Sequence, residues 1–194
     1  MNVSLSMTTS ALCASIAAAR AEGADISDEA EALVVRLFHL EGRSLVRLAR
    51  IFVDDRDAAE DIVQEAFLRL ARHAGRIRDE SKAPAYLRSI VLNLARDHNR
   101  RGLLSLRHHA PAGHNVDVNP RAFEEELVRD DAHRAVLQAV RALPRRQRDC
   151  VTLRYFEELG IEAIAATLDL SPNSVKTHLR RGMATLESRL GDVR

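Results

Sequence analysis

Apolar residues recur at helical spacing through most of this chain. Between residues 28 and 53 they follow steps of three and four, which predicts one or two helices with a possible break at Gly42. A further helix is expected from Asp57 to about residue 74, because Asp57 followed by Glu60 forms a capping box. The chain therefore opens with amphipathic helices.

The apolar pattern is interrupted twice before it resumes in the second half. After a polar loop at residues 75–84, helical spacing predicts a third helix that ends near Gly102. Periodicity then vanishes over 102–121, where Gly, Pro, His and Asn accumulate, as is typical of an exposed linker. We predict a first domain of three helices over 28–101 and a flexible linker over 102–121.

The remaining residues, 122–194, are predicted to form a second small helical domain. Apolar spacing indicates helices over 123–143 and 145–156, separated by Pro144, with Phe156 among the side chains expected to face inward. A short helical pattern over 161–168 follows, then a turn at Asp169 and Leu170, and then a longer helix that opens at Ser171. This order favours a helix-turn-helix, the arrangement in which the second helix enters the major groove of DNA.

The residues of this turn fit its geometry. Ala165 is small enough for the close contact between the two helices, and Asp169 tolerates the left-handed turn conformation. Ser171 and Pro172 are favoured at the start of a helix. The alternative is an amphipathic surface helix with a basic face. The start and outer face of the second helix supply the candidate DNA-binding set, which is Ser171, Pro172, Asn173, Lys176, Thr177, Arg180 and Arg181.

Composition strengthens the all-α prediction. Hydrophobic residues make up 46% of the 194 positions, but aromatic residues only 4%, which disfavours a β-sandwich or barrel. Cys13 and Cys150 lack paired spacing and are expected to be reduced thiols. Residues 1–27 are predicted to be a disordered tail, within which Met7 is a possible true start. No apolar run is long enough to cross a membrane, so we expect a cytoplasmic protein without membrane insertion.

The net charge of +1 conceals a segregation of charges along the chain. Carboxylates crowd residues 28–65, while Arg and Lys dominate 69–107. Such a division suits two unlike partners, one polyanionic and one basic, although solvated helix faces are the alternative. On the helix after Asp57, one stripe is apolar and suited to a core. A second stripe is acidic with one apolar residue, and consists of Asp61, Gln64, Glu65 and Leu68.

Several segments resemble sigma factors of the extracytoplasmic-function group. Residues 143–148 (LPRRQR), 153–156 (LRYF) and 175–181 (VKTHLRR) resemble sigma region four, although 171–179 looks equally like the helix-turn-helix of LuxR-type regulators. Residues 57–70 (DAAEDIVQEAFLRL) favour a sigma factor over a LuxR-type regulator, because they resemble the polymerase-binding helix of sigma region two. Residues 85–101 are similar to the helix that melts the promoter and reads its minus-ten element.

The resemblance implies a function and a set of partners. The acidic stripe would dock on the clamp helices of the largest subunit of core RNA polymerase, region four would contact the beta-subunit flap, and an anti-sigma factor would be a further partner. Region four would read the minus-35 element of promoter DNA. A loop before the third helix would pocket a flipped minus-ten base. The implied minus-ten residues are Lys82, Tyr86, Arg88, Asn93, Arg96, Asp97, Arg100 and Arg101.

Three positions depart from the family pattern. Tyr86 stands where the family usually has Trp, and Asp169 and Gly182 replace the common Gly and Ala. Tyr can still stack on a base. Gly182 is expected to weaken the recognition helix by about 1 kcal/mol relative to Ala.

Other functions are less well supported by the residues. A decoy that only occupies an anti-sigma protein would not need the basic residues, and a stand-alone regulator would not need the polymerase-docking motif. An enzyme is least favoured, because no nucleophile with a base, metal cluster or phosphate-binding Gly loop is present in the sequence. His108, His109 and His114 lack Cys or carboxylate partners at ligand spacing, so neither a metal nor a cofactor is expected.

Overall fold

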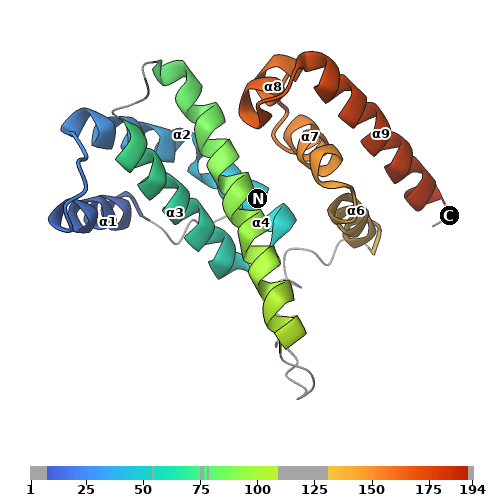
Figure 1. Ribbon diagram of the computed structural model, residues 1–194, viewed down its shortest axis with the longest axis horizontal. Coiled ribbons are helices and arrows are strands. Elements are labelled where there is room, and N and C mark those ends of the chain that lie inside the picture. The colour runs from blue at the N-terminus through green and yellow to red at the C-terminus, as the bar shows by residue number, and fades with distance from the viewer. Residues whose placement is uncertain (1–7, 54, 75–76, 78, 109–130, 192–194) are drawn as a thin grey trace. The chain divides into compact units, whose positions relative to one another are not determined.

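The computed structural model describes residues 8–53, 55–74, 77, 79–108 and 131–191, and Figure 1 shows their arrangement. The described segments are helices joined by turns, with no strand among them, which confirms the all-α prediction. The chain divides into two compact units, with the boundary between Asn99 and Arg100.

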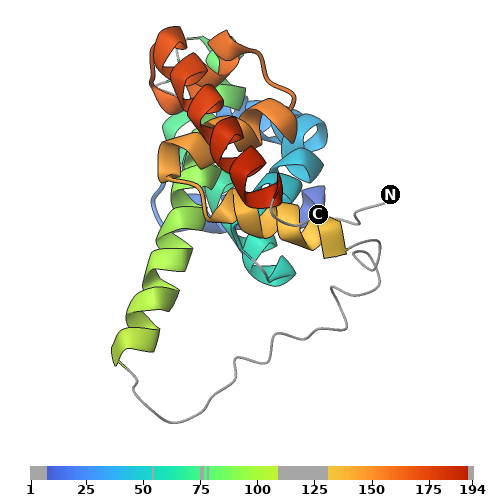
Figure 2. The same ribbon diagram turned by 90° about the vertical axis from the view of Figure 1, so that its right-hand side faces the viewer.

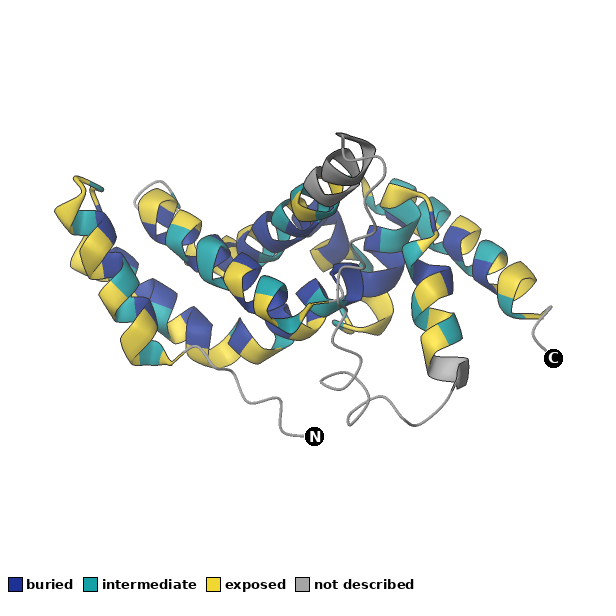
Figure 3. Ribbon diagram, turned by 90° about the horizontal axis from the view of Figure 1, so that it is seen from below, coloured by how far each residue is buried: buried dark blue, intermediate teal, exposed yellow. Residues whose placement is uncertain are grey.

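The first unit is built from four α-helices. They are α1 (Thr9–Ala21), α2 (Asp28–Phe52), α3 (Arg56–His73) and α4 (Ala83–His108), with the short 3-10 helix η2 (Glu80–Lys82) immediately before α4. In Figure 3 buried and exposed residues alternate along the described parts of these helices, as expected when one side of each packs on a core. Phe38 of α2 meets Phe67 of α3 edge to face at the centre of this core, with ring centroids 5.5 Å apart.

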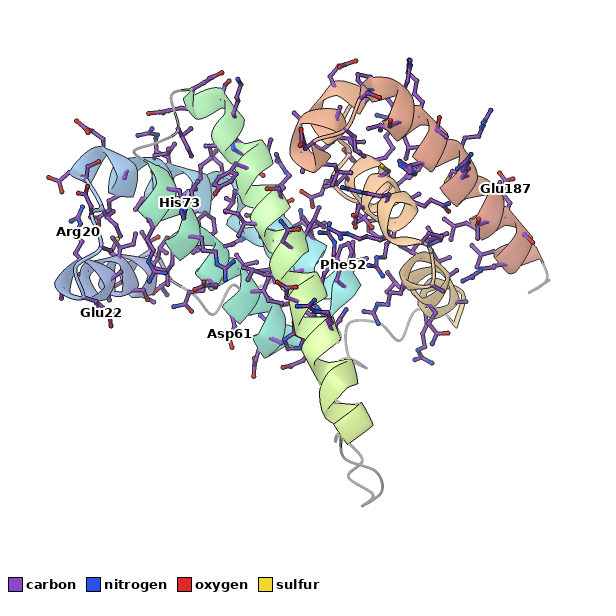
Figure 4. The ribbon with its side chains drawn as sticks, viewed as in Figure 1. Arg20, Glu22, Phe52, Asp61, His73 and Glu187 are labelled. Carbon is purple, nitrogen blue, oxygen red and sulfur yellow. The ribbon has the colours of Figure 1, made fainter. Side chains whose placement is uncertain are left out.

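The predicted disordered tail over 1–27 is wrong for residues 9–21, which form α1. Leu12 and Ile16 are fully buried, one turn apart, and Thr8 caps the helix by accepting a hydrogen bond from the amide of Ala11. Arg20, labelled in Figure 4, then joins α1 to the start of α2 through an ion pair with Asp28. An Ala-rich helix with only two large apolar residues gives a weak pattern in sequence, so its tertiary packing was not visible there.

Two local details of the first unit differ from the sequence predictions. α2 runs unbroken through Gly42, which is buried. The cap of α3 is Asp55 and not Asp57, because the Asp55 carboxylate accepts hydrogen bonds from the amides of Asp57 and Ala58 at 3.3 and 3.1 Å. Each change extends regular helix beyond the predicted element.

The helix α4 also continues beyond its predicted end at Gly102, as far as His108. The linker predicted over 102–121 is therefore helical in its first seven residues. A single Gly costs a helix only about 1 kcal/mol, and the leucines that follow it are good helix formers. Residues 109–121, with His109 and His114, and the side chains of Arg101 and His108 lie outside the described part of the chain.

The second unit contains α6 (Asp131–Arg141), α7 (Arg145–Tyr155), α8 (Ile161–Leu168) and α9 (Pro172–Gly191). In Figure 2 α9 lies diagonally across this unit, and it contacts α6, α7 and α8. Leu153, Ile164 and Val175 are fully buried between these helices. Phe156, which was expected to face inward, is 38% exposed because it follows the last turn of α7.

α9 approaches α7 closely at Gly182, which is buried on the inner face of α9. A Cβ atom at this position would lie 2.8 Å from Cγ2 of Val151 on α7 and 3.5 Å from Cβ of Gln147. The sequence suggested that Gly182 weakens the helix relative to Ala. The structure shows that the missing side chain makes room for α7, so the two helices can pack at this distance.

Candidate polymerase and nucleic-acid interfaces

The acidic stripe of α3 lies outside the buried face of the helix. Ile62, Ala66 and Leu70 are buried, as predicted for the core stripe. Asp61 is exposed and points outward in Figure 4, whereas Gln64, Glu65 and Leu68 are partly exposed. The Glu65 carboxylate accepts a hydrogen bond from Nε of Arg69 at 2.7 Å. The structure thus brings the four predicted docking residues together on one accessible surface.

α1 lies beside this stripe, which could not be anticipated from the sequence. Nε2 of Gln64 donates a hydrogen bond to Oγ of Ser15 on α1 at 3.0 Å. One of the four stripe residues is therefore held by a helix that was predicted to be disordered. The signal available in sequence was the pair Leu12 and Ile16, whose spacing of four places both on one side of a helix.

α2 and α4 run side by side in the same direction. Arg88 of α4 forms an ion pair with Glu41 of α2, and the side chain of Asn99 donates to the backbone carbonyl of Phe52 at 2.7 Å. In each pair, the residue of α4 follows its partner on α2 by 47 positions (88 − 41 and 99 − 52). The register of the two helices is therefore the same at two points about three turns apart.

This register places the predicted minus-ten residues on two different sides of α4. Arg88 is only 13% exposed at its side chain because it is used in the pair with Glu41. Tyr86, Asn93 and Arg100 are exposed on the outer face, and Asp97 is partly exposed. Nη1 of Arg96 donates to Oδ1 of Asn93 at 2.6 Å, which orients the Asn93 amide. The outer face therefore offers an aromatic ring, an amide and cations, whereas Arg88 joins the helices.

The segment before α4 is organised by Asp79. Its carboxylate accepts hydrogen bonds from the hydroxyl of Ser81 at 2.6 Å and from the Ser81 amide at 3.1 Å, and it lies 3.8 Å from Nζ of Lys82. The Ser81 hydrogen bonds, with a smaller contribution from Lys82, lower the pKa of Asp79. Glu80 pairs with Arg36 of α2 at 2.8 Å. Lys82 is thus held beside the start of α4 with an exposed ammonium group.

The turn between α8 and α9 has the geometry that the sequence predicted. Asp169 ends α8 in the left-handed conformation (φ 53°, ψ 56°), and the amide of Leu170 donates to the carbonyl of Ala165 at 3.0 Å. Nη1 of Arg146 on α7 donates to the carbonyl of Leu168 at 3.2 Å. The turn is therefore fixed both locally and from α7.

α9 begins with the predicted cap and presents a polar outer face. Oγ of Ser171 accepts from the amide of Ser174 at 3.1 Å, and Pro172 is the first residue of the helix. The Thr177 hydroxyl donates to the carbonyl of Asn173 at 3.0 Å, and the residue is partly exposed. The exposed members of the predicted set are Ser171, Asn173, Lys176, Arg180 and Arg181.

Comparisons with known proteins identify the two units. Residues 37–102 match the family description "Sigma-70 region 2", and residues 133–186 match "Sigma-70, region 4". The RNA polymerase sigma-E factor of Streptomyces coelicolor is 34% identical over 151 residues, which cover 76% of this chain and 80% of that protein. The chain belongs to the extracytoplasmic-function group of sigma-70-family RNA polymerase sigma factors.

Solved structures show the same fold. CnrH in complex with the cytosolic domain of CnrY has a TM-score of 0.61 and 25% identity, and the match covers 91% of this chain and 96% of that one. The sigma factor RpoE in complex with the anti-sigma factor NepR from Bartonella quintana has a TM-score of 0.60 and 18% identity, and the match covers 82% of this chain and 97% of that one. This chain spans only 60% of the length of another curated relative, the sigma factor BldN of S. coelicolor.

Across the described residues, no helix combines the length and the apolar character that crossing a bilayer requires.

Proposed function

We propose that this protein binds core RNA polymerase and directs it to promoters by recognising minus-10 and minus-35 elements. The observation that carries the proposal is the presence, in one chain, of a region-2 unit with an accessible acidic stripe and a region-4 unit with an intact helix-turn-helix. A protein with this role needs no catalytic residue and no cofactor of its own. The polymerase supplies the chemistry, and its site of action would be the cytoplasm.

The acidic stripe on α3 is the proposed docking surface for the clamp helices of the largest polymerase subunit. Asp61 and Glu65 supply negative charge, and Leu68 adds an apolar contact that is partly exposed in the free protein. Opposite charges across an interface guide the encounter and fix the orientation of the partners. In the second unit, the exposed rings of Tyr155 and Phe156 at the end of α7 suit contact with the beta-subunit flap.

The outer face of α4 is proposed to bind the minus-10 element as single-stranded DNA. Tyr86 can stack on an unpaired base, Asn93 can form hydrogen bonds with a base edge, and Arg100 can neutralise a phosphate. Lys82 lies beside the start of this face. Arg88 is assigned a supporting role, because its pairing with Glu41 holds α4 in register with α2. Residues 28–101 would thus serve both the polymerase and the minus-10 element.

The second unit, within residues 122–194, is proposed to read the minus-35 element as a duplex. Asn173 and Lys176 are exposed near the start of α9, which is the part of a recognition helix that meets base edges, and the exposed Arg180 and Arg181 follow about one turn later. Two linked modules bind one promoter more tightly than either alone, because the second contact occurs at a raised effective concentration.

An anti-sigma factor is the further partner that we propose. The solved RpoE structure contains the anti-sigma factor NepR, and the CnrH structure contains the cytosolic domain of CnrY. Both proteins share the fold of this chain. A protein that covers the docking stripe of α3 would prevent association with core polymerase.

Transcription in vitro tests the proposal directly. Core polymerase is incubated with and without the protein on a library of random promoters, and the enriched transcripts reveal the recognised motif. The double variant Asp61→Lys, Glu65→Lys is expected to lose association with the core enzyme. Its charge-matched control is Glu162→Lys, Glu187→Lys, which reverses two exposed carboxylates of the second unit. Wild-type protein that does not associate with core polymerase would exclude this function.

A further inference from the structure

Gln64, in the acidic stripe of α3, is hydrogen-bonded to α1. Nε2 of Gln64 donates to Oγ of Ser15 at 3.0 Å. The two residues are 49 positions apart in sequence, and both are partly exposed. The hydrogen bond therefore joins α1 to an accessible residue of the stripe and not to the buried core.

Gln64 occupies a central position in the stripe. Asp61 lies three residues before it and Leu68 four residues after it, so the three side chains form one row along α3. Glu65 is its neighbour in sequence. The residues that dominate the binding energy of an interface cluster near its centre. The orientation of the Gln64 side chain therefore matters more than that of a residue at the edge.

The contact with Ser15 leaves the oxygen of the Gln64 amide accessible. A side-chain amide carries donors on its nitrogen and an acceptor on its oxygen. Ser15 binds the nitrogen, whereas Oε1 accepts no hydrogen bond among the described residues and is reached by solvent. The charged groups of Arg and Lys are donors without an acceptor. Gln64 thus offers a basic partner the acceptor that such a partner requires.

α1 is anchored on both sides of Ser15. Leu12 and Ile16 are fully buried and fix the helix against the rest of the first unit. Beyond them, Arg20 forms an ion pair with Glu31 of α2 at 3.0 Å. The Ser15 hydroxyl is therefore in place before a partner arrives. Such preorganisation avoids part of the entropy cost of ordering a long side chain on binding.

We infer that Ser15 is a positioning residue of the polymerase interface, which holds the Gln64 amide so that Oε1 accepts hydrogen bonds from the basic partner of the acidic stripe. The inference rests on the proposed function and makes α1 a support of the docking surface. Without the hydroxyl, the Gln64 side chain would be ordered only on binding. Loss of the hydroxyl should therefore weaken binding to core polymerase by about twofold to tenfold.

Competition for core RNA polymerase tests the inference. Unlabelled full-length variants displace a fluorescently labelled wild-type protein from the core enzyme, which gives each dissociation constant. Ser15→Ala should raise this constant by about twofold to tenfold, and Ser15→Thr, which keeps a hydroxyl group, should restore it. The matched control is Ser10→Ala, at an exposed position of α1 whose side chain forms no hydrogen bond in the described part of the chain, so its affinity should be unchanged.

A double-mutant cycle shows whether Ser15 acts through Gln64. In the background Gln64→Met, which has a long side chain without an amide, Ser15→Ala should cause no further loss of affinity. The urea midpoint of Ser15→Ala should stay close to that of the wild type, because the helix preference of alanine offsets the lost hydrogen bond. Wild-type affinity in Ser15→Ala, or independent effects of the two substitutions, would overturn the inference.

Failure of this inference can be told apart from failure of the proposed function. The variant Asp61→Lys, Glu65→Lys is included in the same competition. Binding by the wild type that is lost in this lysine variant, together with unchanged affinity in Ser15→Ala, rejects the role of Ser15 alone. A wild-type protein that does not bind the core enzyme rejects the proposed function.

Discussion

Substitution of Gly182 tests whether the close packing of α9 on α7 controls the stability of the second unit. Two effects of Gly182→Ala oppose each other. Alanine is favoured over glycine in a helix by about 1 kcal/mol. However, its Cβ would lie 2.8 Å from Cγ2 of Val151, which is buried and β-branched and cannot turn away freely. Overpacking of this kind costs about 1 to 3 kcal/mol, so a net loss of about 1 kcal/mol is expected.

When Val151 is also replaced by alanine, the effect of Gly182→Ala on stability is expected to change sign. Val151→Ala removes the atom that the new Cβ would meet, whereas the contacts with Gln147 at 3.5 and 3.6 Å are ordinary. In the Val151→Ala background, Gly182→Ala should therefore stabilise the unit by about 1 kcal/mol through helix propensity. The coupling energy between the two sites is then about 2 kcal/mol, within the range observed for residues in contact.

Urea denaturation of the four proteins of this cycle gives the free energies. The chain has no tryptophan, so Tyr155→Trp on α7, present in every member of the cycle, provides fluorescence from the second unit alone. Ala184→Gly, at an exposed position of the same helix, measures propensity without packing. If Gly182→Ala stabilised the protein with Val151 intact, close packing would not be the reason for glycine at this position.

Three further outcomes can be measured. Asp169→Gly should raise the free energy of unfolding of the second unit by about 1 kcal/mol, because glycine adopts the left-handed conformation without strain, and an unchanged urea midpoint would contradict this. Leu12→Ala should cost the first unit about 2 to 5 kcal/mol in chemical denaturation, whereas Ala17→Ser on the exposed side of α1 should cost little. Burial raises the pKa of Cys150 to about 11, so at about pH 8 iodoacetamide should label Cys13 first, and equal rates would show that Cys150 is accessible.

The fold could be predicted from sequence wherever an element carries a strong apolar stripe or a distinctive turn. The helices around Ile62 and Val175 and the left-handed Asp169 belong to this class. α1 could not, because alanine is compatible with a tail, and only the packing of Leu12 and Ile16 makes it a helix of the core. The end of α4 was also missed, since one glycine does not outweigh the helix formers that follow it.

The residues of the candidate sites could also be predicted from sequence only in part. Helical spacing was sufficient to place Asp61 and Leu68 on one face, because that depends on a single helix. Arg88 was grouped with the DNA-binding residues because its partner, Glu41, is distant in sequence and belongs to another helix.

The common register of α2 and α4 limits where this chain can accept insertions and deletions. The ion pair at Glu41 and the hydrogen bond at Phe52 both require the same offset, so adding one residue to α2 between them would rotate one contact by about 100° relative to the other. Extra residues between the end of α3 and the start of η2 would change neither pair. Length variation among homologous chains should therefore concentrate in that connection and be rare within the two helices.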